Sequence, residues 1–410
     1  MDLSLPLMSD NINRRDIDCL IEFLKQDPIP RMTNGPKVVE FEQKWSEWLG
    51  VKHSVFVNSG TAANELSMLA LTHLYPEGGE IIVPPLTWIS DINSVLFANF
   101  DPVFVDINKY NLSFDLDKLE ESITDKTRAI FVTHVLGINA LSDRLLHICE
   151  DRGIKLIEDV CESHGATFNG TKVGSFGFAS NFSFYFAHHM STIEGGMIST
   201  DDDNFYQLCR ALRSHGMIRE FTDENLKQEY ANEYSDLNED FIFIGKAHNF
   251  RSTEMNAVLG LCQLERLDSN NHVRIDNFNY FMGELDSNKY HTEINMYGQC
   301  NYAFIVILKE PDYQKRNEIE KILDDNKIEF RRGLSGGGNQ MRQPHFKDHN
   351  FNFGNFSNIE HIHNFSWYIG NYPTLKIEKL NNLDIKKKVH QPVLIDRYDS
   401  HLMSPEPKKW

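Results

Sequence analysis

Short apolar runs that alternate with helical stretches are the feature that most constrains how this chain can fold. The runs are SVFV (54–57), EIIV (80–83), VFVD (103–106), AIFVT (129–133), IKLIED (154–159), NFSFYF (181–186) and MIST (197–200). Helical stretches near residues 61–74, 88–98 and 141–152 separate several of them. Strands that are apolar on both faces and separated by helices are typical of a mainly parallel sheet with helices on both sides. We therefore expect an α/β fold.

The pattern changes near residue 265, after a helix expected at 253–267. The next segments are expected to be a charged helix, a strand, a second charged helix and a mixture of short strands and turns, at 272–287, 301–308, 314–325 and 355–375. Such a mixture is typical of an α+β arrangement. We expect residues 1–265 to form a large α/β domain with an N-terminal helical segment, and residues 266–410 to form a smaller C-terminal α+β domain.

The charge of the chain excludes several classes of partner. It has 41 Lys and Arg against 59 Asp and Glu, which gives a formal net charge of −18. Nucleic acids and anionic membranes bind basic surfaces, so neither is an expected partner. No apolar run approaches the ~20 residues that cross a bilayer, and the first residues, MDLSLPLMSD, lack the regions of a signal peptide. Six dispersed cysteines are typical of reduced thiols, so we expect a cytoplasmic protein.

The motif NSGTAAN (58–64) is a candidate phosphate site. It leads from a strand through a Gly-containing turn into a helix. Backbone amides in the first turn of a helix have no partners within the helix, so the amides of Gly60 and Thr61 and the Thr61 hydroxyl suit a phosphate. An N-capped helix after a tight turn explains the same residues. The motif alone leaves both interpretations open.

The segment LIEDVCESHGA (156–166) places acids at the carboxyl end of a buried strand, where open α/β sheets bind ligands. Asp159 could pair with a protonated ring nitrogen, or it could be a turn aspartate. In NFSFYFAHHMSTIEGGM (181–197), a strand with Ser183 leads to His188 and His189. Neighbouring side chains point apart and seldom share a metal ion, so the residues alone favour structural histidines.

The C-terminal part offers weaker candidates. The Gly-rich segment GLSGGGN (333–339) lacks the Lys-Ser/Thr ending of a P-loop, and we expect a flexible loop. Arginines at 331, 332 and 342 surround it and suit an anionic ligand. His361 and His363 are expected on one face of a strand, but no nearby Cys or acid completes a metal set.

Several motifs together resemble the DegT/StrS-type sugar aminotransferases, which are fold-type I pyridoxal phosphate (PLP) enzymes with a seven-stranded-type sheet. They are NSGTAAN (58–64), VPPLTWISDINSVLFANFDPVFVDI (83–107), IEDVCESHGA (157–166), FSFYFAHHMSTIEGGM (182–197), LRSHGM (212–217) and HNFRSTEMNAVLGLCQLERLD (248–268). Residues 30 to 375 are covered by the resemblance, and so many motifs in the same order make it specific.

The resemblance implies roles for individual residues. The cofactor phosphate would be held by Gly60, Thr61 and Ser183, and by Asn249 of a neighbouring subunit in a homodimer or a dimer of dimers. The pyridine ring would lie between Trp88, which stacks on it, and Asp159, which keeps its nitrogen protonated. Glu162 would lie near the ring hydroxyl, where the family often has Gln; a carboxylate there is unfavourable unless one group is protonated.

The family's usual pattern has a Schiff-base lysine five residues after the phosphate-binding serine, and this chain has His188 there. Imidazole cannot form a Schiff base, so the cofactor would not be anchored covalently. A subgroup with this change comprises the 3-dehydratases of nucleotide-linked 4-keto-6-deoxy sugars, which use PLP and pyridoxamine 5'-phosphate (PMP). Two further segments resemble that subgroup, GGGNQMRQPHF (336–346) and HNFSWYIGNYP (363–373).

The subgroup implies a reaction and its participants. We expect removal of the C3 hydroxyl of a nucleotide-linked 4-keto-6-deoxy sugar, with GDP as the expected nucleotide, His188 as the base, release of ammonia, and regeneration of PMP from glutamate. The substrate would be bound by Arg331, Arg332, Asn339 and Arg342. Residues 210–261 contain no cysteine, so an iron–sulfur cluster is not expected. An aminotransferase that lacks the lysine, or an inactive cofactor-binding homologue, is the alternative. The implied pathway is bacterial O-antigen or capsule synthesis.

Overall fold

A seven-stranded sheet forms the centre of the computed structural model, which describes residues 3–349 and 351–376. Its strand order is β1-β9-β8-β5-β4-β2-β3. The strands are β1 (His53–Val57), β2 (Glu80–Val83), β3 (Asp101–Phe104), β4 (Thr127–Thr133), β5 (Lys155–Asp159), β8 (Ala179–Ser183) and β9 (Gly196–Thr200). Only β9 of these runs against the others, since both of its pairings are antiparallel. The expected mainly parallel α/β sheet is confirmed.

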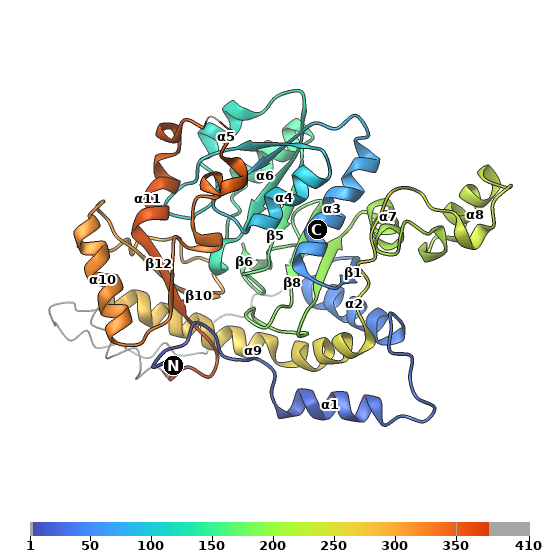
Figure 1. Cartoon of the computed structure of the whole chain (residues 1–410), viewed down its shortest axis with the longest axis horizontal. Coiled ribbons are helices and arrows are strands. Elements are labelled where there is room, and N and C mark those ends of the chain that lie inside the picture. The colour runs from blue at the N-terminus through green and yellow to red at the C-terminus, as the bar shows by residue number, and fades with distance from the viewer. Residues whose placement is uncertain (1–2, 350, 377–410) are drawn as a thin grey trace, which may run out of the picture.

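Helices cover both faces of this sheet (Figure 1). They are α2 (Pro36–Leu49), α3 (Gly60–Leu74), α4 (Ile89–Phe97), α5 (Leu116–Ser122), α6 (Asp143–Arg152) and α7 (Asp203–Arg213). Side chains along a strand alternate between faces, so each strand contributes to two cores. In β2, Ile82 packs in the core with α2 and α6, whereas Ile81 and Val83 pack in the core with α3, α4 and α7. Burial on both faces explains why these strands are apolar throughout.

One long helix, α9 (Glu254–Glu284), runs through the expected domain boundary (Figure 1). The two helices expected at 253–267 and 272–287 are therefore a single element. Its first half contributes Ala257 to the large core, and its second half contributes Phe278 to the core of the C-terminal part. The N-terminal helix α1 (Arg14–Leu24) packs along α9. The division of the chain into two domains at residue 265 stays a prediction.

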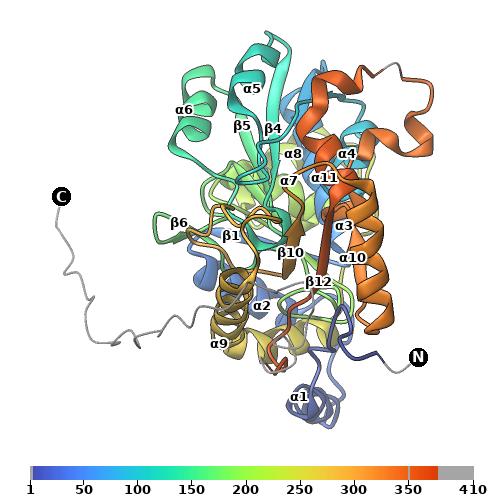
Figure 2. The same ribbon diagram turned by 90° about the vertical axis from the view of Figure 1, so that its left-hand side faces the viewer.

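A three-stranded antiparallel sheet organises the C-terminal part, in the order β10-β12-β11. Its elements are β10 (Ala303–Ile307), α10 (Tyr313–Asp325), β11 (Phe330–Arg332), α11 (Ser357–Phe365) and β12 (Ser366–Gly370). Helix α10 lies along β12 on the side away from α9 (Figure 2). The expectation of short strands and turns at 355–375 was wrong in part, because α11 occupies its first half. His361 and His363 therefore lie on a helix, two positions apart, and do not share a strand face.

Three smaller segments lie outside the two large sheets. The N-terminal segment packs across the molecule: Leu5 forms a bridge with Ile328, and the Asn11 side-chain amide donates to the backbone oxygen of His188. Between α7 and α9, helix α8 (Glu224–Glu233) projects outward (Figure 1). A short two-stranded sheet, β6 (Thr167–Phe168) with β7 (Thr171–Lys172), lies outside both larger sheets.

All six cysteines are free in the structure. The sulfur atoms of Cys19 on α1 and Cys262 on α9 lie 2.8 Å apart. Within residues 3–349 and 351–376, none of the helices combines the length and hydrophobicity that a bilayer crossing requires.

Candidate active site

A cavity of about 580 Å³ lies at the carboxyl ends of the central strands, between the large sheet and the C-terminal part. It collects residues from many segments of the chain. Eight of the residues singled out from the sequence line it: Gly60, Thr61, Trp88, Asp159, Glu162, Ser183, His188 and Arg331. Ligands of open α/β sheets bind at this edge, so the cavity is the candidate active site.

The phosphate candidate lies at the start of α3. Ser59 is the N-cap, and its hydroxyl accepts a hydrogen bond from the Ala62 amide at 3.0 Å. A Cβ atom on Gly60 would lie 2.6 Å from the Cβ atom of Ser183, so only glycine lets the helix approach β8 this closely. The capped helix and the anion cradle are thus compatible. The amides of Gly60 and Thr61 and the Ser183 hydroxyl can converge on one phosphate.

A pair of carboxyl groups joins Asp159, which lines the cavity, to Asp91, which does not. Asp159 ends β5, and its side chain accepts a hydrogen bond from the Cys161 amide at 2.8 Å. Asp91 on α4 is fully buried and accepts bonds from Asn64 at 2.7 Å and from Thr133, the strand partner of Asp159, at 3.1 Å. Burial and the adjacent Asp159 carboxylate raise the pKa of Asp91 well above its usual value. Asp91 is therefore a proton-carrying neighbour of Asp159.

Asp91 was missed in the sequence. The signal that could have found it is an acid in the first turn of a short helix with few other charges, three residues after Trp88. Acids in a first turn ordinarily favour the helix dipole, which makes such a residue easy to overlook.

Glu162 links the large sheet to the Gly-rich loop. Its carboxylate accepts a hydrogen bond from the Leu136 amide at 3.0 Å and one from the Ser335 hydroxyl at 3.2 Å. Burial raises the pKa of Glu162 to about 7. The group is therefore partly protonated at neutral pH, which is the condition under which a carboxyl group can lie beside a phenolate.

The two adjacent histidines have different surroundings. The ring of His188 is half-buried at the cavity wall, 5.6 Å from the ring of Tyr302, whereas His189 is fully buried and its Nε2 atom lies 2.9 Å from the Cys300 carbonyl oxygen. Burial and the guanidinium of Arg274 lower the pKa of His188 to about 3. The structural interpretation thus holds for His189, and His188 is an uncharged imidazole facing the cavity.

Three predicted substrate residues do not line the cavity. Arg332 forms two hydrogen bonds to Glu320, at 2.6 and 2.5 Å. Arg342 and Asn339 both donate to Glu360, at 2.8 and 2.7 Å. These contacts hold the Gly-rich loop and its flanking residues against α10 and α11, so a structural role explains why Arg332, Asn339 and Arg342 lie where they do. Their role in substrate binding stays a prediction.

Asn249 also lies outside the cavity of its own chain. Its side chain is exposed, and its Oδ1 atom accepts hydrogen bonds from the backbone and guanidinium nitrogens of Arg251 at 3.3 and 3.0 Å. Its expected contact is with the cofactor of a neighbouring subunit, and that contact stays a prediction.

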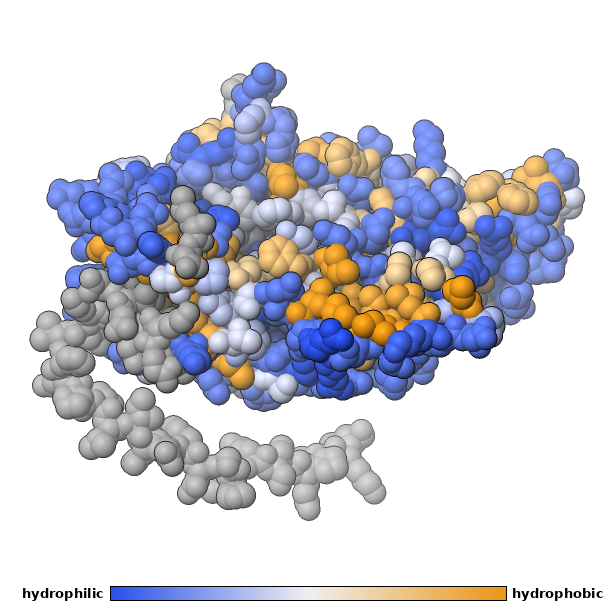
Figure 3. Space-filling model, turned by 60° about the horizontal axis from the view of Figure 1, so that its bottom comes forward, coloured by the Kyte–Doolittle hydropathy of each residue, from blue (hydrophilic) through white to orange (hydrophobic). Residues whose placement is uncertain are grey.

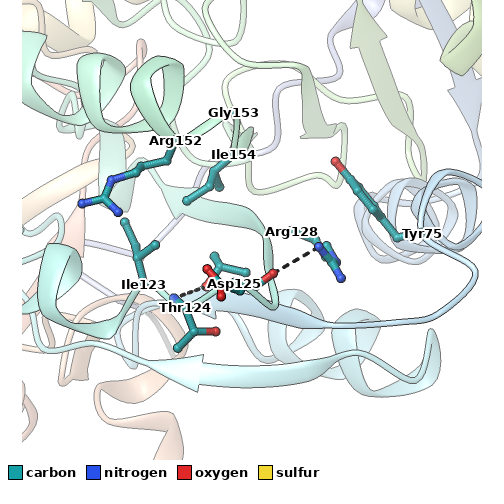
Figure 4. Close-up of a pocket in the computed structure, with 9 residues that line it drawn as sticks. Tyr75, Ile123, Thr124, Asp125, Arg128, Arg152, Gly153 and Ile154 are labelled. Carbon is teal, nitrogen blue, oxygen red and sulfur yellow. Dashed lines mark hydrogen bonds between the residues drawn. The ribbon is translucent and has the colours of Figure 1, made fainter.

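A second cavity, of about 330 Å³, lies at the opposite edge of the sheet, where β4 and β5 begin (Figure 4). Its most prominent cation is Arg128, which pairs with Glu77 at 3.2 Å and donates to the backbone oxygens of Gly78 and Asp125. The charge of Arg128 is therefore compensated locally. None of the residues singled out from the sequence lines this cavity.

One family model matches the sequence over residues 11–383. The chain belongs to the DegT/DnrJ/EryC1/StrS aminotransferase family. The predicted family is therefore confirmed. So is the fold, because the chain superimposes with a TM-score of 0.81 on a solved GDP-4-keto-6-deoxymannose-3-dehydratase with a trapped PLP–glutamate geminal diamine. That structure is 28% identical, and the match covers 93% of this chain and all of the other.

Two relatives in this family differ in activity. GDP-4-keto-6-deoxy-D-mannose 3-dehydratase of Yersinia pseudotuberculosis is 31% identical over 395 residues, covering 94% of this chain and 99% of the relative. GDP-perosamine synthase of Caulobacter vibrioides is 37% identical over 234 residues, covering 57% of this chain and 58% of the relative. The dehydratase likeness extends along nearly the whole chain, whereas the synthase likeness covers little more than half of it.

Proposed function

We propose that this protein is a PLP/PMP-dependent 3-dehydratase that removes the C3 hydroxyl of a GDP-linked 4-keto-6-deoxy sugar. The products are a 4-keto-3,6-dideoxy sugar nucleotide and ammonia, and glutamate returns the cofactor to its amine form. One observation carries the proposal: within the described part of the chain, the cavity lining contains His188 and no lysine. An aminotransferase of this fold needs a lysine amine there to hold the cofactor between half-reactions.

The cavity residues fit this cofactor. Its phosphate suits the cradle at the start of α3, which a side chain on residue 60 would fill. Trp88 offers a ring for stacking, and Asp159 offers a carboxylate for the pyridinium nitrogen. When bound, the cofactor supplies the electron sink that makes loss of the C3 hydroxyl feasible. Without a covalent bond, these contacts alone must hold it, so we expect it to be lost on dialysis.

His188 acts as the base that moves a proton at the C4' carbon of the cofactor amine. Its Nδ1 atom is buried, which leaves Nε2 as the exposed nitrogen toward the cavity. Because its pKa is lowered, the imidazole is uncharged over the whole physiological range and can accept a proton. Glu162, with a pKa of about 7, can share a proton with the ring hydroxyl of the cofactor.

The substrate reaches the cavity past the C-terminal part. Arg331 lines the cavity and pairs with Glu329 at 3.0 Å, so it is the first candidate for an anionic group of the nucleotide or of glutamate. Arg332, Asn339 and Arg342 would contribute once their contacts with Glu320 and Glu360 rearrange.

The active unit is a homodimer, alone or within a dimer of dimers. Figure 3 displays apolar side chains gathered on one face of the molecule. Exposed apolar residues of the N-terminal segments and of the loop after β8 include Ile17, Ile29, Met32, Val39, Tyr185 and Ile193. Tyr185 also lines the cavity, so a second copy that covers this loop would close the cavity. The partner would supply Asn249 to the phosphate.

A direct assay separates the candidate activities. Protein incubated with PMP, glutamate and GDP-4-keto-6-deoxymannose is expected to release ammonia and a 3-deoxy sugar nucleotide. An amino sugar nucleotide as the product would instead support the aminotransferase alternative, which the likeness to the perosamine synthase motivates. No turnover of any 4-keto sugar nucleotide would support an inactive homologue. The cytoplasmic location is part of this proposal, and cell fractionation tests it.

A further inference from the structure

A buried cation without a counter-ion lies on α9. Arg274 is fully buried, and its Nη1 atom donates to the backbone oxygens of Tyr302, at 3.2 Å, and of Asn371. Its Nε and Nη2 atoms have no hydrogen-bond partner in the described part of the chain, and no carboxylate there lies within salt-bridge distance. Burial lowers its pKa only to about 10, so the group stays charged at neutral pH. Burying an unpaired charge destabilises the folded protein, so the position of Arg274 calls for an explanation.

Arg274 is connected to a group of imidazoles through its neighbours. Its guanidinium donates to the Tyr302 carbonyl, and the Tyr302 ring lies 5.6 Å from that of His188 in a tilted arrangement. One turn earlier on α9, the Asn271 amide donates to the backbone oxygen of His164 at 2.9 Å. The His164 ring lies 6.2 Å from His188 and 5.3 Å from His189. Three imidazoles are thus packed between α9 and the cavity wall.

A positive charge in this position disfavours protonation of the imidazoles. The pKa values of His188, His164 and His189 are all lowered. Burial is the largest cause, and the charge of Arg274 is a further cause for all three. The cavity that His188 lines also has these titratable or charged groups: Asp159, Cys161, Glu162, Tyr185, Glu194, Tyr302, Glu329, Arg331 and Tyr368. Burial raises the pKa of Cys161, Tyr302 and Tyr368, so these three are neutral at physiological pH, and it raises the pKa of Glu162 to about 7. Among the charged groups, Arg274 is the one that contributes to the lowered pKa of His188.

We propose that Arg274 is a positioning residue for the reaction, which acts through its charge to keep His188 and the two imidazoles behind it uncharged. This inference rests on the proposed function, in which His188 is the base. The same charge destabilises His188 once it has accepted a proton. The proton is therefore passed on to the product rather than retained, and the base is ready for the next turnover.

The test measures protonation of His188 directly in the cofactor-free full chain. Histidine ring signals are followed by NMR between pH 3 and 8, and His188→Asn identifies the His188 signal by its loss. In the wild type we expect His188 to be neutral above about pH 4.5, because its pKa is about 3. In Arg274→Gln its midpoint should rise by about one pH unit and enter the measured range, which increases the charged fraction at pH 5 about ten-fold. Arg274→Lys keeps the charge and should behave like the wild type.

A matched control separates charge from burial. Arg213 is also fully buried on α7, but it pairs with Glu42 and the Phe56 carbonyl. Arg213→Gln should lower stability and leave the His188 titration unchanged. If Arg274→Gln does not fold, Asn271→Asp provides a counter-charge one turn away, and it should raise the His188 midpoint in the same direction.

Two results would overturn the inference. One is a wild-type His188 that titrates near pH 6.5, and the other is an unchanged His188 titration in Arg274→Gln or, if that variant does not fold, in Asn271→Asp. Failure of the proposed function is distinguishable, because an inactive wild type leaves the NMR outcome intact. With an active enzyme, the acid limb of the kcat/KM profile should move upward in Arg274→Gln and stay in place in Arg274→Lys.

Discussion

At the scale of single residues, buried neighbours set the protonation states of the groups that line the candidate site. Asp91 and Asp159 are neighbours, and they cannot both be ionised without strong repulsion. His188 is kept neutral by burial and by Arg274. In the proposed function, Asp159 is suited to a cationic ring nitrogen and His188 is an uncharged base. Asp91 and Arg274 do not line the cavity and act through these neighbours.

Replacing His188 by Asn should separate binding from chemistry. The amide keeps a polar side chain at the cavity wall but cannot accept a proton at neutral pH. PMP should therefore still bind, while dehydration slows by ~10²–10⁴-fold, the usual contribution of a general base. Stopped-flow kinetics and a PMP titration measure the two effects, and the exposed His147→Asn is the control. A dehydration rate in His188→Asn close to that of the wild type would show that His188 is not the base.

Replacing Asp91 by Asn should change how stability depends on pH. The pKa of Asp91 is raised in the folded protein. Its contribution to the free energy of unfolding is therefore fully present below about pH 4, the usual pKa of an aspartate. That contribution is lost as the pH rises toward the folded pKa. Asn mimics the protonated acid and removes this loss. The unfolding temperature of Asp91→Asn should exceed that of the wild type by on the order of 2 °C at pH 8 and by less at pH 5.

The matched control for this prediction is Asp276→Asn, an exposed position on α9 with no ion pair in the described structure. It should show no such pH dependence. An unfolding temperature of Asp91→Asn that lies below the wild type at both pH values would show that Asp91 is needed as a carboxylate.

At the scale of elements, sequence patterns predicted the sheet well and two helices poorly. Alternation of apolar strands with helices is a local signal, and it placed every strand of the large sheet. The break expected in α9 lies at its polar middle, Asp268–Ser269–Asn270–Asn271, but these four residues include no Gly or Pro and the helix continues through them. Helix α11 was missed because aromatic residues around it suggested strands, although Ile359 and Ile362 already had helical spacing.

The start of α3 can be tested through its glycine. In Gly60→Ala the new methyl group would meet Ser183 at 2.6 Å and push the helix away from β8. We expect affinity for inorganic phosphate and for PMP to fall by at least about ten-fold, with secondary structure retained. Gly283→Ala is the control, since a Cβ atom there meets no atom within 4 Å. Equal PMP affinity in Gly60→Ala and wild type would argue against a phosphate at this helix.

At the scale of the whole molecule, the sequence predicted which residues gather but not what supports them. The family resemblance named most of the eight residues that line the cavity, and those at strand ends converge because parallel strands end at one edge. Asp91 and Arg274 become neighbours of the site only through the packing of α4 and α9. The arginines at 332 and 342 were expected at the ligand because their charge is visible in the sequence, whereas their partners Glu320 and Glu360 are not adjacent to them.

Mixing two defective variants tests the shared site of the dimer. Asn249→Ala and His188→Asn should each be nearly inactive alone. If Asn249 serves the neighbouring subunit, mixed dimers contain one intact site, and random exchange should restore about a quarter of wild-type activity. Refolding the two chains together and assaying ammonia release measures this. No recovery, with exchange verified by mass spectrometry, would place Asn249 outside the partner's site.

The N-terminal segment described above has a consequence for how the protein is made. Leu5 pairs with Ile328 and Asn11 binds the carbonyl of His188, so the wall of the cavity joins the first residues to a strand made more than three hundred residues later. When the ribosome has translated the large sheet, Gly60, Thr61 and Ser183 have been synthesised, but Ile328, the partner of Leu5, has not. Contacts so distant in sequence form slowly. The nascent chain is therefore expected to fold its sheet first and to become competent for cofactor capture only near the end of synthesis.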